Sequence, residues 1–146
     1  MARPLRRALR LGPRAWPDLL RAVLELALAR WRLGRHPSRE LIRHSQRPLP
    51  TSRAVPADPS AVVDRVALAV GRVAAHVPWR ADCFVQALAA QAWLARAGLA
   101  SDIHIGVRQD RAPGFEAHAW LTQSGRVVTG GEVGGFVPLV TPDTPV

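Results

Sequence analysis

The sequence predicts an α+β fold, with helices in the first two thirds of the chain and a small antiparallel sheet in the last third. Apolar residues recur at helical spacing in three segments between residues 17 and 98, each with a helix-start signal. From residue 102 onward apolar and polar residues alternate, as in half-buried strands. With 146 residues, the chain has the length of one domain and can bury its own core.

The first helix is predicted from Pro17 to Gly34, because proline suits the first helical position and glycine a left-handed C-cap. Its apolar stripe is predicted to comprise Leu20, Val23, Leu24, Ala27, Leu28 and Trp31. Residues 35–60 hold five prolines, which indicates a linker with at most a short helix over 39–44.

The second helix is predicted to begin at Asp58-Pro59 and to stop near Pro78. Its stripe comprises Val62, Val63, Val66, Ala69, Val70 and Val73, and it can cover the same core as the first helix.

Asp82 can cap a third helix, whose first residue is Cys83 and which ends at Gly98. One face of this helix is predicted to carry Phe84, Ala87, Leu88, Gln91, Ala92 and Ala95. Cys83 therefore lies in a first helical turn, where unpaired backbone amides and the positive end of the helix dipole stabilise a thiolate.

Three strands are predicted after this helix. The first has alternating Ile103, Ile105 and Val107; the next two, 116–122 and 126–129, form a hairpin around Gln123-Ser124-Gly125. His118 and Trp120 share one face of the second strand, and the small residues Ala117 and Ala119 share the other with Leu121, so that a helix can pack closely there. The tail from residue 130 is expected to be a loop, anchored by Phe136-Val137-Pro138-Leu139.

The net charge of +9 resides in the N-terminal third, since residues 1–53 carry 13 arginines against 3 carboxylates. All 20 basic residues are arginines, which fits a GC-rich genome as well as selection for binding, so the charge does not indicate a nucleic-acid partner. Arginines interrupt residues 3–14, and the apolar stretch 19–33 contains four charged residues, which argues against a signal peptide and a membrane span and favours the cytoplasm. A nucleic-acid or acidic-membrane binder built on residues 1–53 is the least favoured function, since only Trp16 and Trp31 lie among its arginines. The single cysteine excludes an intrachain disulfide and a zinc site of several thiolates, and no metal or cofactor is expected.

Cys83 and His118 are the candidate catalytic pair. A thiol attacks acyl carbonyls as the thiolate, so it needs an imidazole within hydrogen-bond reach and a helix or a cation beside it. Taken alone the pairing is weakly specific, because a lone cysteine is usually a small buried residue. His104, which alternates with isoleucines, is interpreted as a surface histidine or one satisfied by a local hydrogen bond.

A longer pattern adds specificity. It consists of Cys83-Phe84-Val85-Gln86-Ala87-Leu88, Ile103-His104-Ile105-Gly106-Val107-Arg108, Phe115-Glu116-Ala117-His118-Ala119-Trp120 and Phe136-Val137-Pro138-Leu139. This pattern, over residues 78–139, closely resembles the transglutaminase-like cysteine leader peptidases of lasso-peptide biosynthesis. The resemblance implies a papain/transglutaminase-like core, here residues 58–146, in which Cys83 is the nucleophile and His118 its general base. Residues 1–57 then form a basic helical N-terminal region with a Pro-rich linker.

The chain departs from this pattern at the third catalytic position. Members of the family commonly carry an Asp about a dozen residues after the histidine, which orients the imidazole. The corresponding stretch here, 127–132, contains no Asp. We expect Glu132 to take this role; the alternatives are Thr129, a backbone carbonyl, or a Cys–His dyad without a third member.

The resemblance implies hydrolysis of one peptide bond, the removal of the leader from a ribosomally made lasso-peptide precursor. The implied partners are that precursor, a small leader-recognition protein of the pyrroloquinoline-biosynthesis type, and the lasso cyclase. The chain shows no room for the recognition domain ahead of the protease, so a stand-alone protease is expected. A catalytically weakened binding or scaffold protein with the same fold, in the same biosynthetic complex, is the alternative.

Overall fold

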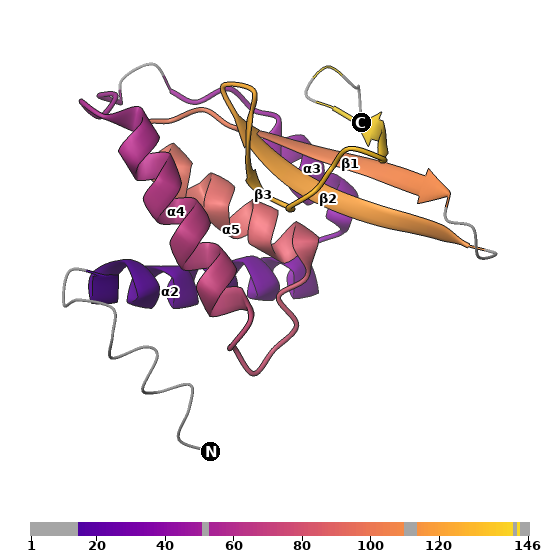
Figure 1. Cartoon of the computed structure of the whole chain (residues 1–146), viewed down its shortest axis with the longest axis horizontal. Helices are drawn as coiled ribbons and strands as arrows, with labels where there is room; N and C mark the ends of the chain where they lie inside the picture. Colours follow the sequence, from indigo (N-terminus) through magenta and orange to yellow (C-terminus); the bar gives the residue numbers. More distant parts are fainter. Residues whose placement is uncertain (1–14, 51–52, 110–113, 142, 144–146) are drawn as a thin grey trace.

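The computed structural model describes residues 15–50, 53–109, 114–141 and 143. Its helices are α2 (Trp16–Arg35), α3 (Ser38–Ser45), α4 (Pro59–Ala74) and α5 (Cys83–Arg96) (Figure 1). The strands that follow are β1 (Asp102–Gln109), β2 (Phe115–Gln123), β3 (Arg126–Thr129) and β4 (Val137–Val140). The predicted α+β fold is confirmed, and α3 is the short helix expected near 39–44. The arginines before residue 15 and residues 110–113 lie outside the described residues.

The sheet is antiparallel, with strand order β3-β2-β1-β4. β1 pairs with β2 along its whole length, and this register sets Gly106 opposite His118. The predicted tail loop is wrong for residues 137–140, which form β4 at the edge of the sheet. An edge strand tolerates Pro138, because one of its sides needs no ladder hydrogen bond.

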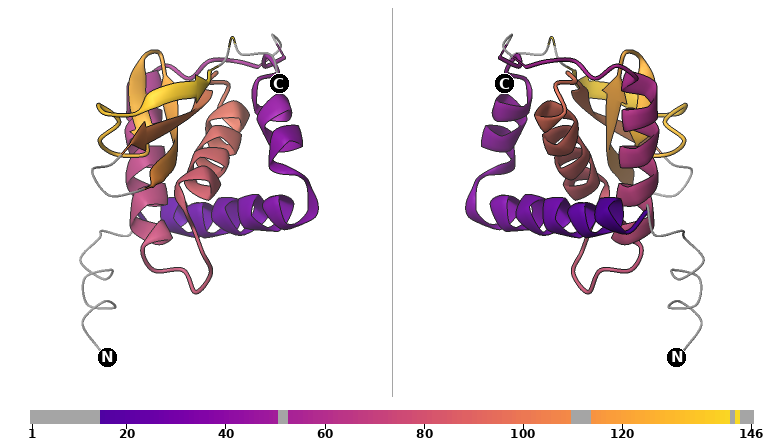
Figure 2. Two further views of the ribbon diagram at one scale, coloured as in Figure 1. Left: turned by 90° about the vertical axis from the view of Figure 1, so that its right-hand side faces the viewer. Right: turned by 90° about the vertical axis from the view of Figure 1, so that its left-hand side faces the viewer.

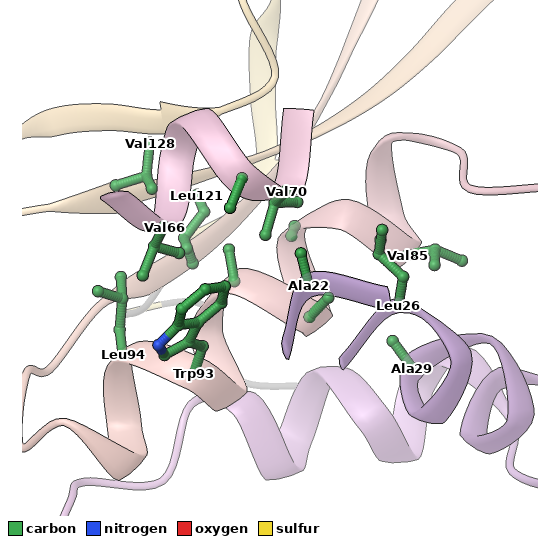
Figure 3. Packing of buried hydrophobic residues seen from close by; sticks show 14 of the residues in the cluster. Ala22, Leu26, Ala29, Val66, Val70, Val85, Trp93, Leu94, Leu121 and Val128 are labelled. Atoms are coloured by element: carbon green, nitrogen blue, oxygen red, sulfur yellow. The ribbon is translucent and has the colours of Figure 1, made fainter. Parts of the chain in front are cut away.

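The helices gather on one side of the sheet, as the two side views show (Figure 2). α5 packs against β2 and is flanked by α2 and α4. Side chains from these helices and from β2 and β3 meet in one core around Trp93 (Figure 3). The prediction that the first two long helices cover the same core is confirmed. The predicted valine stripe of α4 is also confirmed, with Val62 partly buried and the rest buried.

The buried face of α2 differs from the predicted one. The structure buries Ala22, Glu25, Leu26 and Ala29. Four residues of the predicted stripe are exposed instead: Leu20 (61%), Leu24 (64%), Leu28 (42%) and Trp31 (52%). Two physical causes account for the difference: Ala22 and Ala29 allow α2 to approach its neighbours closely, and Glu25 is tolerated inside because Arg96 of α5 donates a hydrogen bond to it.

The predicted face of α5 is also displaced. The structure buries Val85, Ala87, Ala89, Ala90, Trp93 and Leu94. Helices or strands surround α5 on several sides, so its burial does not follow a single amphipathic stripe. Gln91 is half-buried and donates to the carbonyl oxygens of Ser45 and Ser101, at 3.0 Å each, which ties α3 and the start of β1 to α5. In the described part of the chain, no helix has the length and apolar character needed to cross a membrane.

Candidate active site

The start of α5 fixes the position of Cys83. Asp82 is the N-cap residue, and its Oδ1 accepts a hydrogen bond from the amide of Val85 at 3.1 Å. This places Cys83 at the first helical position, as the sequence predicted, and its side chain is half-buried. Its Sγ accepts a hydrogen bond from the backbone amide of Ala119 on β2, at 3.4 Å. The sulfur therefore lies at an edge of β2, one residue away from His118.

This edge of β2 is open because β3 is short. β3 pairs with β2 only over Leu121–Gln123, so no ladder partner from β3 reaches Ala119. Because an amide of a strand lies in the plane of the sheet, the amide of Ala119 is left to face the N-terminus of α5. Both the strand amide and the first-turn amides of α5 place partial positive charge beside the sulfur, which is the environment a thiolate nucleophile requires.

His118 is oriented by a backbone carbonyl. Its Nε2 lies 2.7 Å from the carbonyl oxygen of Gly130. A carbonyl oxygen only accepts hydrogen bonds, so Nε2 carries a proton and, in the neutral ring, Nδ1 carries the lone pair. His118 is thus held in the tautomer in which Nδ1 is the basic nitrogen.

Gly130 can supply this carbonyl because it has no side chain. Its φ is +109°, and a Cβ on this residue would lie 2.4 Å from Cβ of Trp120. Any other residue would have to move the backbone that bonds to His118. Gly130 is a site residue that sequence reasoning did not single out. Its signal was a glycine twelve residues after the histidine, where the leader peptidases that the sequence resembles commonly carry an Asp.

Glu132 lies two residues further on, with its side chain exposed to solvent. The hydrogen bond to the His118 ring that the sequence assigned to this carboxylate is made by the Gly130 carbonyl. Thr129, the other named side chain, is buried, and its Oγ1 has no hydrogen-bond partner among the described residues. Of the groups considered for orienting the His118 ring, the backbone carbonyl is the one that forms a hydrogen bond with it in the described structure. A role for Glu132 in the reaction stays a prediction.

A row of rings lies around His118 on the face of the sheet away from the helices. The rings of His118 and Phe136 are 4.9 Å apart, and the Arg108 guanidinium lies 4.7 Å from the Phe136 ring. Trp120 is buried, and its ring stacks at 6.2 Å from that of His118 and at 5.5 Å from that of His104. The packing limits rotation of the His118 ring.

His104 and Gln86 have local structural partners. His104 Nε2 is 2.9 Å from the hydroxyl of Thr122, in agreement with its interpretation as a satisfied histidine. Gln86 donates to the carbonyl oxygen of Ala81 at 2.8 Å, across the turn before α5. Neither side chain has the environment of a second base or of an oxyanion donor.

The arrangement can support thiol chemistry on an acyl group. A thiol at a helix start lies against the strand that carries an oriented imidazole, since Cys83 Sγ contacts the residue that follows His118. In the described structure, the hydrogen bonds of Cys83 Sγ and His118 go to backbone groups and not to each other. Catalytic hydrogen bonds of this kind often tighten only when substrate binds.

Comparison with known proteins gives one match. The family model of the Transglutaminase-like superfamily matches residues 20–141. No curated protein and no solved structure matches the chain. The matched range includes α2 to β4, and with them both Cys83 and His118. The chain therefore belongs to the Transglutaminase-like superfamily.

Proposed function

We propose that the protein is a cysteine peptidase that removes the leader from a ribosomally synthesised lasso-peptide precursor. The observation that carries the proposal is the placement of Cys83, at the capped start of α5, beside the residue that follows His118 on β2. The superfamily includes cysteine peptidases, and the Cys83, Ala-His-Ala-Trp and Gly-Val-Arg segments resemble the leader peptidases. The membership favours acyl chemistry, and the resemblance favours the leader as substrate.

In the proposed reaction, the Cys83 thiol transfers its proton to Nδ1 of His118, and the thiolate attacks the carbonyl carbon of the scissile bond. The backbone amide of Cys83, a first-turn amide without an intrahelical acceptor, faces the developing oxyanion together with a second donor. The tetrahedral intermediate breaks its C–N bond while protonated His118 donates a proton to the leaving amine. This releases the core peptide with a free N-terminus.

The leader then remains bound to Cys83 as a thioester. A water molecule loses a proton to His118 and attacks the thioester carbonyl. The C–S bond breaks, the sulfur regains its proton from His118, and the leader leaves as a carboxylic acid. The Gly130 carbonyl stabilises the protonated ring in both steps by accepting its Nε2–H.

The proposed partners are the precursor, a small leader-recognition protein of the pyrroloquinoline-biosynthesis type, and the lasso cyclase that uses the new N-terminus. A recognition protein that holds the leader would speed cleavage mainly by raising the local concentration of the scissile bond. The reaction as written needs no metal or organic cofactor, since thiol and imidazole supply nucleophile, acid and base.

A second candidate function is a binding or scaffold protein with the same fold and a weakened site. The absence of the expected Asp, and the lack of a hydrogen bond between the Cys83 sulfur and the His118 ring in the described structure, favour this alternative. A peptidase requires the Cys83 thiol for cleavage of the precursor, whereas a binding or scaffold protein does not require it for its function.

The test is cleavage of the precursor, followed by mass spectrometry in the presence of the recognition protein. We expect Cys83→Ala and Cys83→Ser to keep the fold, because the half-buried thiol fills little of the core, and to lower cleavage by about a thousandfold or more. Alkylation of the thiol should have the same effect. Near-normal cleavage by either folded variant would contradict the peptidase proposal and favour the scaffold.

A further inference from the structure

The outer face of α2 carries a line of large apolar side chains that the protein's own core does not use. This line, Leu20, Leu24, Leu28 and Trp31, advances by four, four and three residues, so its members stay on one side of the helix. Each of them is between 42% and 64% exposed. The opposite face of α2 already packs on α4 and α5. Several large apolar side chains exposed along one side of a helix are typical of an interaction surface.

A groove continues this line at the C-terminal end of α2. It lies between α2, α3 and the later turns of α5, has a volume of about 1030 Å³, and is lined by Trp31 and Arg32 of α2. Figure 2 shows α3 standing alongside α5 above this end of α2. Leu41, Leu88 and Leu99 contribute apolar surface to the groove. The groove meets α5 at Leu88 and beyond, and Cys83, the first residue of α5, does not line it.

The surroundings of the line and the groove are strongly basic. Among the described residues of this region, six arginines are exposed: Arg30, Arg32, Arg35, Arg39, Arg43 and Arg47. The exposed carboxylate among residues 15–50 is Glu40. The two carboxylates of α2 turn inward, where Asp18 pairs with Arg65 and Glu25 with Arg96. The surface therefore combines apolar side chains with an excess of positive charge.

We propose that the outer face of α2 and the adjoining groove bind an acidic amphipathic segment of a partner protein. Its apolar side chains would cover the line from Leu20 to Trp31, and its carboxylates would face the arginines. A second copy of this chain fits poorly, since pairing of the two α2 faces would place the arginines of one copy against those of the other, and these charges repel. A flat bilayer surface would leave the groove unfilled, and a nucleic acid would not bury the leucines. The proposal goes beyond the peptidase function and does not depend on Cys83.

The experiment measures the binding of a fluorescent synthetic helix to the full chain by polarisation. The probe is an 18-residue peptide with leucines at positions i, i+3, i+4 and i+7 and glutamates elsewhere; a sister peptide has lysine in place of every glutamate. We expect the glutamate peptide to bind, and the lysine peptide to bind at least about tenfold more weakly. Binding of the glutamate peptide should weaken as salt is raised.

Matched variants locate the site. Leu24→Ser and Trp31→Ser, each at an exposed position, should raise the Kd of the glutamate peptide about tenfold or more. Leu68→Ser on α4, where the leucine is 53% exposed, should change it less than about twofold. Arg32→Glu should weaken binding, whereas Arg72→Glu on α4 should leave it nearly unchanged. Near-UV circular dichroism checks that every variant is folded.

Several outcomes would overturn the proposal. The first is equal affinity of the glutamate and lysine peptides for the protein. The second is an equal loss of affinity for the glutamate peptide in the Leu24→Ser and Leu68→Ser variants. The third is absence of peptide binding while vesicles containing phosphatidylglycerol bind in a way that depends on Trp31, which would assign the face to a membrane. Tight binding of single-stranded DNA that displaces the glutamate peptide would assign it to nucleic acid. None of these measurements uses cleavage, so their failure is separable from that of the peptidase proposal.

Discussion

At the scale of residues, backbone groups organise the candidate site. The amide of Ala119 holds the Cys83 sulfur, and the carbonyl of Gly130 holds the His118 ring. A carbonyl can fix the ring and its tautomer as a carboxylate does. It has no full negative charge, however, and therefore stabilises the imidazolium less. In the proposed reaction, the Gly130 carbonyl is therefore a weaker third member than a carboxylate would be.

The two histidines of the sheet provide the first comparison. We expect His118→Ala to lower cleavage as much as loss of the thiol, because the members of a nucleophile–base unit act together. His104→Ala removes a ring whose described contacts are Thr122 and Trp120, so its effect should be less than about tenfold. Single-turnover cleavage rates of both variants check this. The reverse order of the two effects would show that the base has been misassigned.

The orienting group can be identified with glycine variants. Gly130→Ala should lower cleavage about 10- to 100-fold, because its Cβ would collide with Trp120 and displace the carbonyl from His118. Gly131→Ala is the matched control: its φ is also positive, at +64°, but a Cβ there meets no atom within 4 Å. It should cost about 1 kcal/mol of stability and little cleavage.

Glu132→Gln completes this comparison. With its carboxylate in solvent and the Gly130 carbonyl on the ring, cleavage by the variant should stay within about twofold of the parent rate. A substantial loss, with Gly130→Ala nearly as active as Gly131→Ala, would show that the loop rearranges during the reaction. Glu132 would then be the third catalytic residue, as the sequence suggested.

At the scale of elements, helix-start signals and the periodicity of apolar residues predicted where the helices and most strands lie. They did not predict the buried face of every helix. Asp58, Asp82 and Gly98 mark helix ends that the structure confirms. The stripe of α4 was predicted because only one of its faces is apolar. α2 is apolar on two sides, and the side that packs is the one where the small residues Ala22 and Ala29 flank Leu26, because they allow a close approach. The orienting carbonyl could be named only as an open alternative, since a carbonyl leaves no residue type to recognise.

The two aspartate caps test how the start of α5 supports the site. Asp82 and Asp58 each accept a hydrogen bond from the amide three residues later, at 3.1 Å and 3.0 Å. Asp82→Ala should cost about 1 kcal/mol of stability and also lower cleavage about tenfold, because the first turn that carries Cys83 loses its cap. Asp58→Ala, at the start of α4, should destabilise the protein but leave cleavage at 20 °C unchanged. Equal cleavage by both variants would contradict the positioning role.

The Asp58 cap also has a defined pH dependence. The amide of Ala61, and to a lesser extent the hydroxyl of Ser60, lower the pKa of Asp58 below its ordinary value. A lowered pKa in the folded state means that the cap stabilises the protein above the ordinary value of the carboxyl group and ceases to do so as the pH falls through the lowered one. Asp58→Asn should remove this part of the acid dependence, as measured by urea unfolding between pH 2 and 6.

At the scale of the whole molecule, α2 belongs to the same core as α5, the helix that carries Cys83. Ala22, Leu26 and Ala29 belong to the cluster that contains Trp93 and Leu94 of α5. The family match likewise begins at residue 20, within α2. The domain boundary predicted between residues 57 and 58 stays a prediction. Whatever binds the outer face of α2 would touch a helix whose inner face supports α5, the helix that carries Cys83.

Variants of the ion pair between Glu25 of α2 and Arg96 of α5 test whether α2 supports α5. Glu25 is 5% exposed, accepts a hydrogen bond from Arg96, and lies 3.7 Å from Arg21. Glu25→Gln removes the charge from the inner side, while Arg96, whose side chain is 40% exposed, can still reach water. We therefore expect a loss of about 1–3 kcal/mol in the free energy of unfolding by urea, between the values typical of exposed and buried pairs.

The double variant Glu25→Met with Arg96→Met shows why Glu25→Gln is destabilising. The cause is either that Arg96 is left without its partner or that the junction of α2 and α5 requires both charges. Two apolar side chains of similar length can pack where the pair lies, so this protein should be as stable as the parent or more so. The control is Glu40→Gln, which breaks an exposed pair with His36 and should cost less than about 0.5 kcal/mol. If the double variant is as unstable as Glu25→Gln alone, the junction of α2 and α5 requires the ion pair itself. The cleavage rate of the double variant would then measure how strongly α2 determines the position of Cys83.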